Sequence, residues 1–222
     1  MRQPPMVNAH AVLLAGGAGR RLGGTDKALL DRAGRTLLDH WATALAERGV
    51  SGVVVGPQHL SRHLTPHLRL TREDPPLSGP AAAVCAGVRA LPPANSEDAS
   101  EAVLLFAVDM VNPGPLLDWL VEWLPVLQGT GEQAVVPRDA EGRFQMLSSA
   151  VGRAWLQQRV DRLLPGEEVG QSLRWLLDGA QTAHPVLPYD LSGDVDTPED
   201  ARRHSVSYSH DRPGGGSPPR PA

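Results

Sequence analysis

Short apolar runs alternate along this chain with segments whose apolar residues recur at helical spacing. Residues 10–15, 52–55 and 102–108 are predicted to form buried strands, and residues 37–48 and 79–91 between them are predicted to form helices. Strands that are separated by helices usually pair in parallel, with helices on both faces of the sheet. The alternation therefore predicts an α/β fold of three layers, α/β/α, around a mostly parallel sheet.

Weaker patterns complete this architecture. The last helix should begin at Thr197-Pro198, because Thr is a good cap and Pro fits the first helical position. We expect one domain over residues 9–204, an N-terminal tail over residues 1–8, and a disordered Gly/Pro/Ser-rich tail over residues 205–222. The other predicted elements are strands at 68–71, 133–137, 144–151 and 183–187 and helices at 115–127, 154–164 and 171–177.

Composition excludes several classes of protein. The 222 residues include 25 acidic and 21 basic side chains, and a net charge of -4 argues against a general nucleic-acid or membrane-surface binder. The single cysteine, Cys85, excludes an intrachain disulfide framework and fits a reducing compartment. The apolar run at residues 11–15 is too short for a signal peptide, and no stretch is long enough to span a bilayer. We therefore expect a cytoplasmic protein.

A glycine-rich loop follows the first predicted strand. Residues 14–27 hold five glycines, the arginine pair Arg20-Arg21 and Lys27. Glycines let backbone amides approach phosphate oxygens, and the cations neutralise phosphate charge. The loop is not a P-loop, because Asp26 precedes the lysine, and the dinucleotide fingerprint fails because Leu22 replaces its third glycine. The segment therefore predicts a nucleotide-binding loop of another kind.

Lys27 is the only lysine in the chain. Every other basic side chain is an arginine, so a lone lysine inside the glycine loop indicates a position that needs a compact point charge. The competing interpretation is one surface lysine that survived by chance.

Three acidic side chains stand next to predicted strands or helices. Asp109 directly follows the central strand, where a carboxylate is well placed for a hard cation such as Mg²⁺, although a turn or cap role is equally open. Asp74 could meet a ribose or a metal-bound water, while the nearby Gly79 could simply allow close packing. Asp196 could contact the metal or could only complement a helix dipole.

Four motifs occur in order over residues 10–203: LAGGAGRRLGGTDKALL, EDPPLSGPAAA, LLFAVDM and DVDTPEDA. Together they resemble the molybdenum cofactor guanylyltransferase (MobA-like) family of nucleotidyltransferases. The resemblance implies the Rossmann-like nucleotide-diphospho-sugar transferase fold. It also implies Mg²⁺-dependent transfer of GMP from GTP to the phosphate of molybdopterin, with release of pyrophosphate and formation of molybdopterin guanine dinucleotide.

The resemblance also implies roles for individual residues. Arg21, Lys27 and Asp109 would be catalytic, with Arg21 and Lys27 on the triphosphate and Asp109 on Mg²⁺, and Asp196 would lie near the metal. Gly16 favours GTP, because relatives that use CTP tend to have alanine there. The implied nucleotide-binding set is Leu14, Ala15, Gly16, Gly17, Gly19, Arg20, Lys27, Gly56, Asp74, Gly79 and Asp109.

Two departures from the family pattern leave alternatives open. Gly56 replaces an asparagine that some members carry after the second strand, and residues 143–147 lack a proline that others have. The alternatives are a molybdopterin cytidylyltransferase, a sugar-1-phosphate or phospholactate nucleotidyltransferase, and an inactive nucleotide-binding accessory protein. Further partners would be cofactor-insertion proteins or target molybdoenzymes, with no nucleic acid and no membrane.

Overall fold

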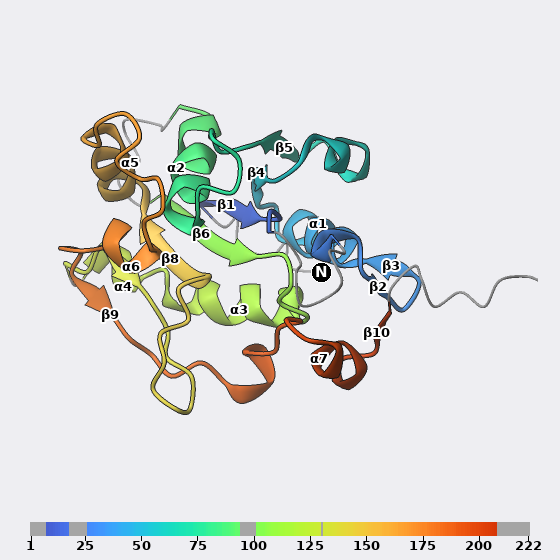
Figure 1. Cartoon of the computed structure of the whole chain (residues 1–222). Coiled ribbons are helices and arrows are strands. Elements are labelled where there is room, and N and C mark those ends of the chain that lie inside the picture. Colours follow the sequence, from blue (N-terminus) through green and yellow to red (C-terminus); the bar gives the residue numbers. More distant parts are fainter. Residues whose placement is uncertain (1–7, 18–25, 94–100, 130, 208–222) are drawn as a thin grey trace, which may run out of the picture.

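A computed structural model describes residues 8–17, 26–93, 101–129 and 131–207, and it has the three layers that the sequence predicts (Figure 1). A seven-stranded sheet runs through the centre in the order β5-β4-β1-β6-β8-β7-β9. The strands are β1 (Ala9–Leu14), β4 (Ser51–Val55), β5 (Leu68–Thr71), β6 (Ala102–Ala107), β7 (Ala134–Val135), β8 (Ser148–Gly152) and β9 (Thr182–Ala183).

The sheet is mostly parallel, as predicted. β1 pairs in parallel with β4 and β6, β4 with β5, and β7 with β9. β8 is the exception, because it pairs antiparallel with both β6 and β7. The carboxyl ends of β5, β4, β1 and β6 therefore meet at one edge of the sheet, where open α/β sheets bind their ligands.

Alternate residues of the central strands enter two separate cores. Ala11 and Leu13 of β1 belong to the core under α1 (Leu37–Glu47) and α3 (Pro113–Trp123). Val12 and Leu14 belong to the core under α2 (Pro80–Ala90), α5 (Arg153–Asp161) and α6 (Leu173–Leu176). This is the two-residue period of a strand that is buried on both faces. Two further α-helices among the described residues are α4 (Val126–Gly129) and α7 (Pro198–Arg203).

Local signals explain where the helices begin. Thr36 and Thr197 each form a capping box with an aspartate three residues later, at the starts of α1 and α7. Cys85 is fully buried on α2, as expected for a core residue. Trp119 and Trp123 are only partly buried, because they lie at the margin of the core under α3.

α2 lies unusually close to β1. A side-chain carbon added at Gly87 would lie 2.4 Å from Cγ1 of Val12, so only glycine allows this approach. The N-terminus of α2 thus lies near the carboxyl end of β1, where Gly79 and Pro80 line the same cleft as Gly16 and Gly17.

A second, three-stranded sheet was not predicted. It has the order β10-β2-β3, with β2 (Asp31–Arg32), β3 (Arg35–Thr36) and β10 (Val206–Ser207). Because Val206 is buried and pairs with Arg32, the fold continues to Ser207, and the predicted domain end at residue 204 is wrong. The expected tails over 1–7 and 208–222 lie outside the described residues.

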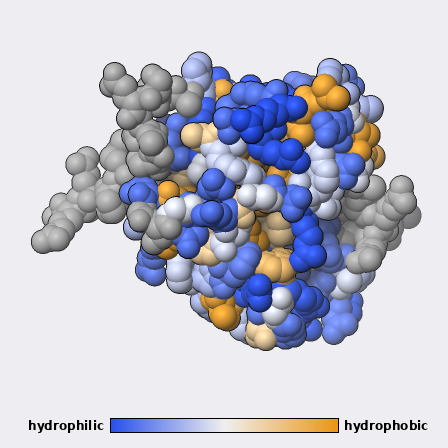
Figure 2. Space-filling model, turned by 90° about the vertical axis from the view of Figure 1, so that its left-hand side faces the viewer, coloured by the Kyte–Doolittle hydropathy of each residue, from blue (hydrophilic) through white to orange (hydrophobic). Residues whose placement is uncertain are grey.

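One face of the molecule carries α5, α6 and β9 (Figure 2). Hydrophobic side chains on this face form small groups separated by hydrophilic ones.

None of the helices in the described ranges combines the length and the apolar composition that a membrane span requires.

Candidate active site

A cleft of about 590 Å³ opens at the carboxyl ends of the central strands, against the N-terminus of α2. Its walls come from β1, β4, β6, the segment after β5 and the segment before α7, so residues far apart in sequence share one cavity. The lining residues are Leu14, Ala15, Gly16, Gly17, Asp26, Lys27, Val55, Glu73, Leu77, Gly79, Pro80, Ala83, Ala107, Val108, Asp109, Leu147 and Asp196.

Lys27 joins two carboxylates at one end of this cleft. Its Nζ donates to Oδ2 of Asp109 at 2.7 Å and to Oδ1 of Asp196, which lies 169 positions away in the sequence. Burial alone would lower the pKa of Lys27, but the carboxylate of Asp109, with a smaller contribution from Asp196, raises it above its usual value. The ammonium therefore keeps its positive charge in the cleft.

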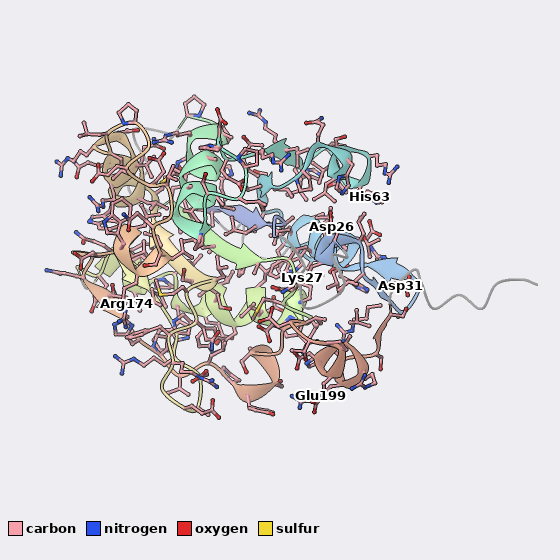
Figure 3. The ribbon with its side chains drawn as sticks, viewed as in Figure 1. Asp26, Lys27, Asp31, His63, Arg174 and Glu199 are labelled. Atoms are coloured by element: carbon pink, nitrogen blue, oxygen red, sulfur yellow. The ribbon has the colours of Figure 1, made fainter. Side chains whose placement is uncertain are left out.

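Lys27 is positioned by a short 3-10 helix, η2 (Lys27–Leu29). Asp26 caps this helix by accepting a hydrogen bond from the backbone N–H of Ala28 at 3.0 Å. The other oxygen of Asp26 lies 2.7 Å from Nε2 of His59. Figure 3 shows Asp26 and Lys27 together at the end of the central strands, while Arg174 lies on the other side of the molecule.

Backbone pairing between two distant segments brings Asp109 and Asp196 together. Val195 donates its N–H to the carbonyl of Asp109 at 3.2 Å, and Met110 forms an antiparallel bridge with Asp194. Burial, together with the charges of Asp109 and Asp196, raises the pKa of Asp194 to about 6. Among the described residues, negative charge thus exceeds positive charge at this end of the cleft, which favours a bound cation.

The opposite end of the cleft is formed by the loop after β5. Glu73 is buried, and its Oε1 accepts a hydrogen bond from the backbone N–H of Leu77 at 2.8 Å. Leu77 has φ 64°, a left-handed conformation that costs a leucine roughly 1–2 kcal/mol, and its side chain is 62% exposed. Gly79 has φ 95° and leads directly into α2.

The structure brings together most of the residues that the sequence singled out. Of the predicted nucleotide and metal set, the cleft is lined by Leu14, Ala15, Gly16, Gly17, Lys27, Gly79, Asp109 and Asp196.

Two predicted residues lie elsewhere. Asp74 is exposed and does not line the cleft. Gly56 is buried and also does not line the cleft. A side-chain carbon added at Gly56 would lie 3.0 Å from the side chain of Leu60 and 3.3 Å from the backbone of Ala15. The geometry favours close packing as the reason for glycine at position 56. Gly19, Arg20 and Arg21 lie outside the described residues.

Sequence reasoning did not single out nine of the lining residues, among them Asp26, Glu73 and Leu77. Asp26 was seen only as a departure from the P-loop pattern, although an aspartate before a helical segment is a typical cap. The sequence analysis singled out Asp74 instead of its neighbour Glu73, whereas in the structure Glu73 is buried against the cleft and Asp74 is exposed. Nothing in the sequence marks Leu77.

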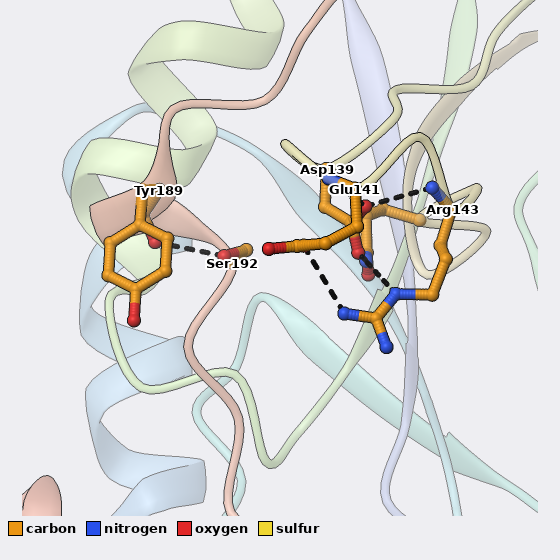
Figure 4. Close-up of polar contacts among 6 residues, drawn as sticks. Asp139, Glu141, Arg143, Tyr189 and Ser192 are labelled. Atoms are coloured by element: carbon orange, nitrogen blue, oxygen red, sulfur yellow. Dashed lines mark hydrogen bonds and ion pairs between the residues drawn. The ribbon is translucent and has the colours of Figure 1, made fainter.

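A second hollow of about 590 Å³ lies beside the segment 139–145 and near α7. Asp139 is buried, and burial would raise its pKa, but hydrogen bonds from the backbone and guanidinium of Arg143 lower it. Figure 4 shows Arg143 reaching both Asp139 and Glu141. Among residues 143–147, where the sequence departs from the family pattern, Arg143, Phe144 and Gln145 line this hollow and Leu147 lines the main cleft.

The donor set of the main cleft fits a magnesium ion. Mg²⁺ prefers oxygen ligands and is usually held by one or two carboxylates together with substrate phosphates and water. Asp109 and Asp196 supply two carboxylates that already share one cation, the ammonium of Lys27. Within the described ranges no group of three or more His, Cys, Asp or Glu side chains could hold a metal. A metal here would therefore depend on oxygens from the substrate.

Known proteins were compared with the chain in sequence and in structure. Residues 11–184 match the MobA-like NTP transferase domain family. A molybdenum cofactor guanylyltransferase from Acidiphilium cryptum (strain JF-5) is 45% identical over 93 residues, which cover 40% of this chain. The match spans only 46% of that relative's length.

Solved structures with the same architecture cover most of the chain. Molybdopterin-guanine dinucleotide biosynthesis protein A from Archaeoglobus fulgidus has a TM-score of 0.64 and 17% identity, over 88% of this chain and 96% of that one. Rv0371c from Mycobacterium tuberculosis H37Rv has a TM-score of 0.65 and 21% identity, over 89% and 97%. At these identities the likeness supports the fold alone.

Proposed function

The chain belongs to the MobA-like NTP transferase domain family, and we propose that it transfers GMP from GTP to the phosphate of molybdopterin. Pyrophosphate would leave, and the product would be molybdopterin guanine dinucleotide. One observation carries the proposal: Lys27, Asp109 and Asp196 converge at one end of a cleft that begins at the glycine loop.

The reaction is one in-line displacement. An oxygen of the acceptor phosphate would attack the α-phosphorus of GTP, and the bond from that phosphorus to the bridging oxygen of pyrophosphate would break. Such transfers need positioning and charge stabilisation rather than a covalent nucleophile. The described residues of the cleft accordingly supply a cation, carboxylates and backbone amides, and no serine or cysteine lines it.

Each part of the cleft would have its own task. The backbone of Leu14 to Gly17 would bind the nucleotide, since these residues line the cleft directly after β1. Lys27 would exchange its carboxylate partners for phosphate oxygens and stabilise the charge that develops on them. On the sequence resemblance, Arg20 and Arg21 would add further positive charge. Asp74 and Gly56, which do not line the cleft, are the weakest members of the predicted nucleotide set.

Asp109 and Asp196 are the residues that would hold magnesium. When bound, Mg²⁺ would neutralise charge on the phosphates and orient them. Burial is the main cause of the raised pKa of Asp194, and a cation between these carboxylates would offset the smaller contribution of Asp109 and Asp196.

A transfer assay tests the proposal. Purified protein is incubated with Mg²⁺, molybdopterin and one of GTP, CTP, ATP or UTP, and the dinucleotide and pyrophosphate are both quantified. We expect product with GTP, little with the other nucleotides, and none after Asp109→Asn. Asp178→Asn is a matched control, because Asp178 is exposed and lies outside the cleft.

The other outcomes separate the alternatives. Product with CTP would indicate a cytidylyltransferase, and product only with a sugar phosphate or phospholactate would indicate another acceptor. Binding of GTP without any pyrophosphate release, with molybdopterin present, would indicate an inactive nucleotide-binding protein.

A further inference from the structure

The main cleft has two chemically different ends. The strand order β5-β4-β1-β6 places the segment after β5 and the segment after β6 three strand spacings apart, or about 14 Å at the usual distance between neighbouring strands. Asp109 and Lys27 lie at the β6 end, and Glu73 and Leu77 lie at the β5 end. A ligand that fills the cleft therefore meets ionic groups at one end and a different surface at the other.

The β5 end suits a flat, mostly apolar ring. At this end the apolar lining comes from Leu77 and, at the start of α2, from Pro80 and Ala83, while Leu14 of β1 lies between the two ends. Leu77 presents its side chain to solvent in a left-handed backbone conformation. A triphosphate belongs at the end with Lys27, so the nucleobase belongs at the β5 end. Glu73 is the one carboxylate among the described residues that line this end.

Glu73 has acceptor capacity that its own loop does not use. The side chain is only 8% exposed, and its Oε1 accepts from the N–H of Leu77. An ionised carboxylate has two oxygens with about four acceptor sites and no donor. A ligand group facing Glu73 must therefore donate hydrogen bonds, and a group with only acceptors would be repelled.

We infer that the carboxylate of Glu73 reads the guanine edge of GTP, accepting hydrogen bonds from N1–H and from the 2-amino group. Among the four common bases only guanine presents two adjacent donors on its pairing edge; adenine and cytosine place an acceptor nitrogen beside their amino group. The inference rests on the proposed function and names the side chain that selects the base. The bond from Leu77 fixes Glu73 in the same loop that closes this end of the cleft.

The test compares GTP with ITP, which lacks the 2-amino group. Dissociation constants for both nucleotides, with Mg²⁺ present, are measured by calorimetry for the wild type and for Glu73→Gln. The amide oxygen of glutamine can still accept the hydrogen bond from the N–H of Leu77, so the loop conformation should be kept. Its NH2 group would face the N1–H and 2-amino donors of guanine, so the hydrogen bonds to the base should be lost. Glu122→Gln, at an exposed position on α3, is the matched control.

We expect the wild type to bind GTP about tenfold or more tightly than ITP, because a site built to accept a hydrogen bond rejects the analogue that lacks the donor. In Glu73→Gln the GTP affinity should fall about tenfold or more, and the preference for GTP over ITP should disappear. Glu122→Gln should keep both affinities. Restored GTP preference in Glu73→Asp would strengthen the assignment.

Three results would overturn it. One is wild-type protein that binds GTP and ITP equally. Another is Glu73→Gln with the full wild-type preference. The third is an equal loss of affinity for both nucleotides, which would identify Glu73 as a support of the loop only. A wild type that binds no nucleotide at all would instead refute the proposed function.

Discussion

β1 and β6 carry an ionic cluster at each end, and the two clusters mirror one another. At the amino end one carboxylate, Glu101, is shared by Arg153 at 2.7 Å and His10 at 2.8 Å. At the carboxyl end one ammonium, that of Lys27, is shared by Asp109 and Asp196.

Burial separates the two clusters. The side chain of Arg153 is 3% exposed and that of Glu101 9%, whereas those of Lys27 and Asp196 are 23% and 46% exposed and border the main cleft. A closed cluster can only hold the fold together, while an open one can exchange partners with a ligand. Access to a cavity, more than the charges themselves, thus distinguishes a binding site from a structural ion cluster.

The largest expected effect on stability is at the amino end. Glu101→Gln leaves the guanidinium of Arg153 buried without a counter-ion, which typically costs about 3–5 kcal/mol of unfolding free energy. Asp118→Asn is the matched control, because Asp118 pairs with Arg48 at 2.7 Å but is itself 65% exposed, and such pairs contribute about 1 kcal/mol or less. Urea denaturation measures both. Equal, small losses would contradict the structural role of the Glu101 cluster.

The second prediction concerns the carboxyl end. Lys27→Met should reduce the transfer rate by roughly 10²–10³-fold, the usual loss when one charge-stabilising donor is removed. Its unfolding free energy should change by less than about 1 kcal/mol, because Lys27 is partly exposed. Lys27→Arg should not restore the rate, since a guanidinium is not an equivalent point charge. If Lys27→Met lost much unfolding free energy but kept its transfer rate, the cluster at the carboxyl end would be structural and the account would be wrong.

The smallest effect is a pH dependence at the amino end. Burial and the charge of Arg153 lower the pKa of His10 below 6.5, although Glu101 and Ser51 oppose them. Below pH 6.5 the unfolded chain then binds the proton more readily than the folded chain, so stability is lost as the pH falls. His10→Gln should flatten this part of the stability profile, whereas His67→Gln, at an exposed position, should not. If the unfolding free energy of His10→Gln depended on pH as steeply as that of the wild type, His10 would not be the source of this pH dependence.

Regular elements could be predicted from the sequence because their signals are local. Apolar runs predicted β1 and β6, and a Thr-Pro start predicted α7. The small sheet could not be predicted, since its strands have only two residues each and the turn between β2 and β3 places Ala33 at φ 55°. β10 lies in a polar segment that resembles a tail, and its structure comes from pairing with β2 and from the burial of Val206 in a small apolar cluster, both of which are contacts with distant residues.

The candidate site was partly predictable for a similar reason. Lys27 stands out as the only lysine, inside the glycine loop, and Asp109 stands out because it directly follows the central strand, at the edge where the carboxyl ends of parallel strands meet. Asp196 had no such signal, because it reaches the cleft through backbone pairing between Val195 and Asp109. Asp74 and Glu73 are neighbours in the loop after β5, and the sequence does not show which of the two side chains turns into the cleft.

A crystal structure of the protein with Mg²⁺ and a non-reacting GTP analogue tests the central claim most directly. The account predicts the triphosphate beside Lys27 and Asp109 and the guanine beside Glu73 and Leu77. Nucleotide bound in the second hollow beside Asp139, or in the main cleft with its base at the Lys27 end, would contradict the account.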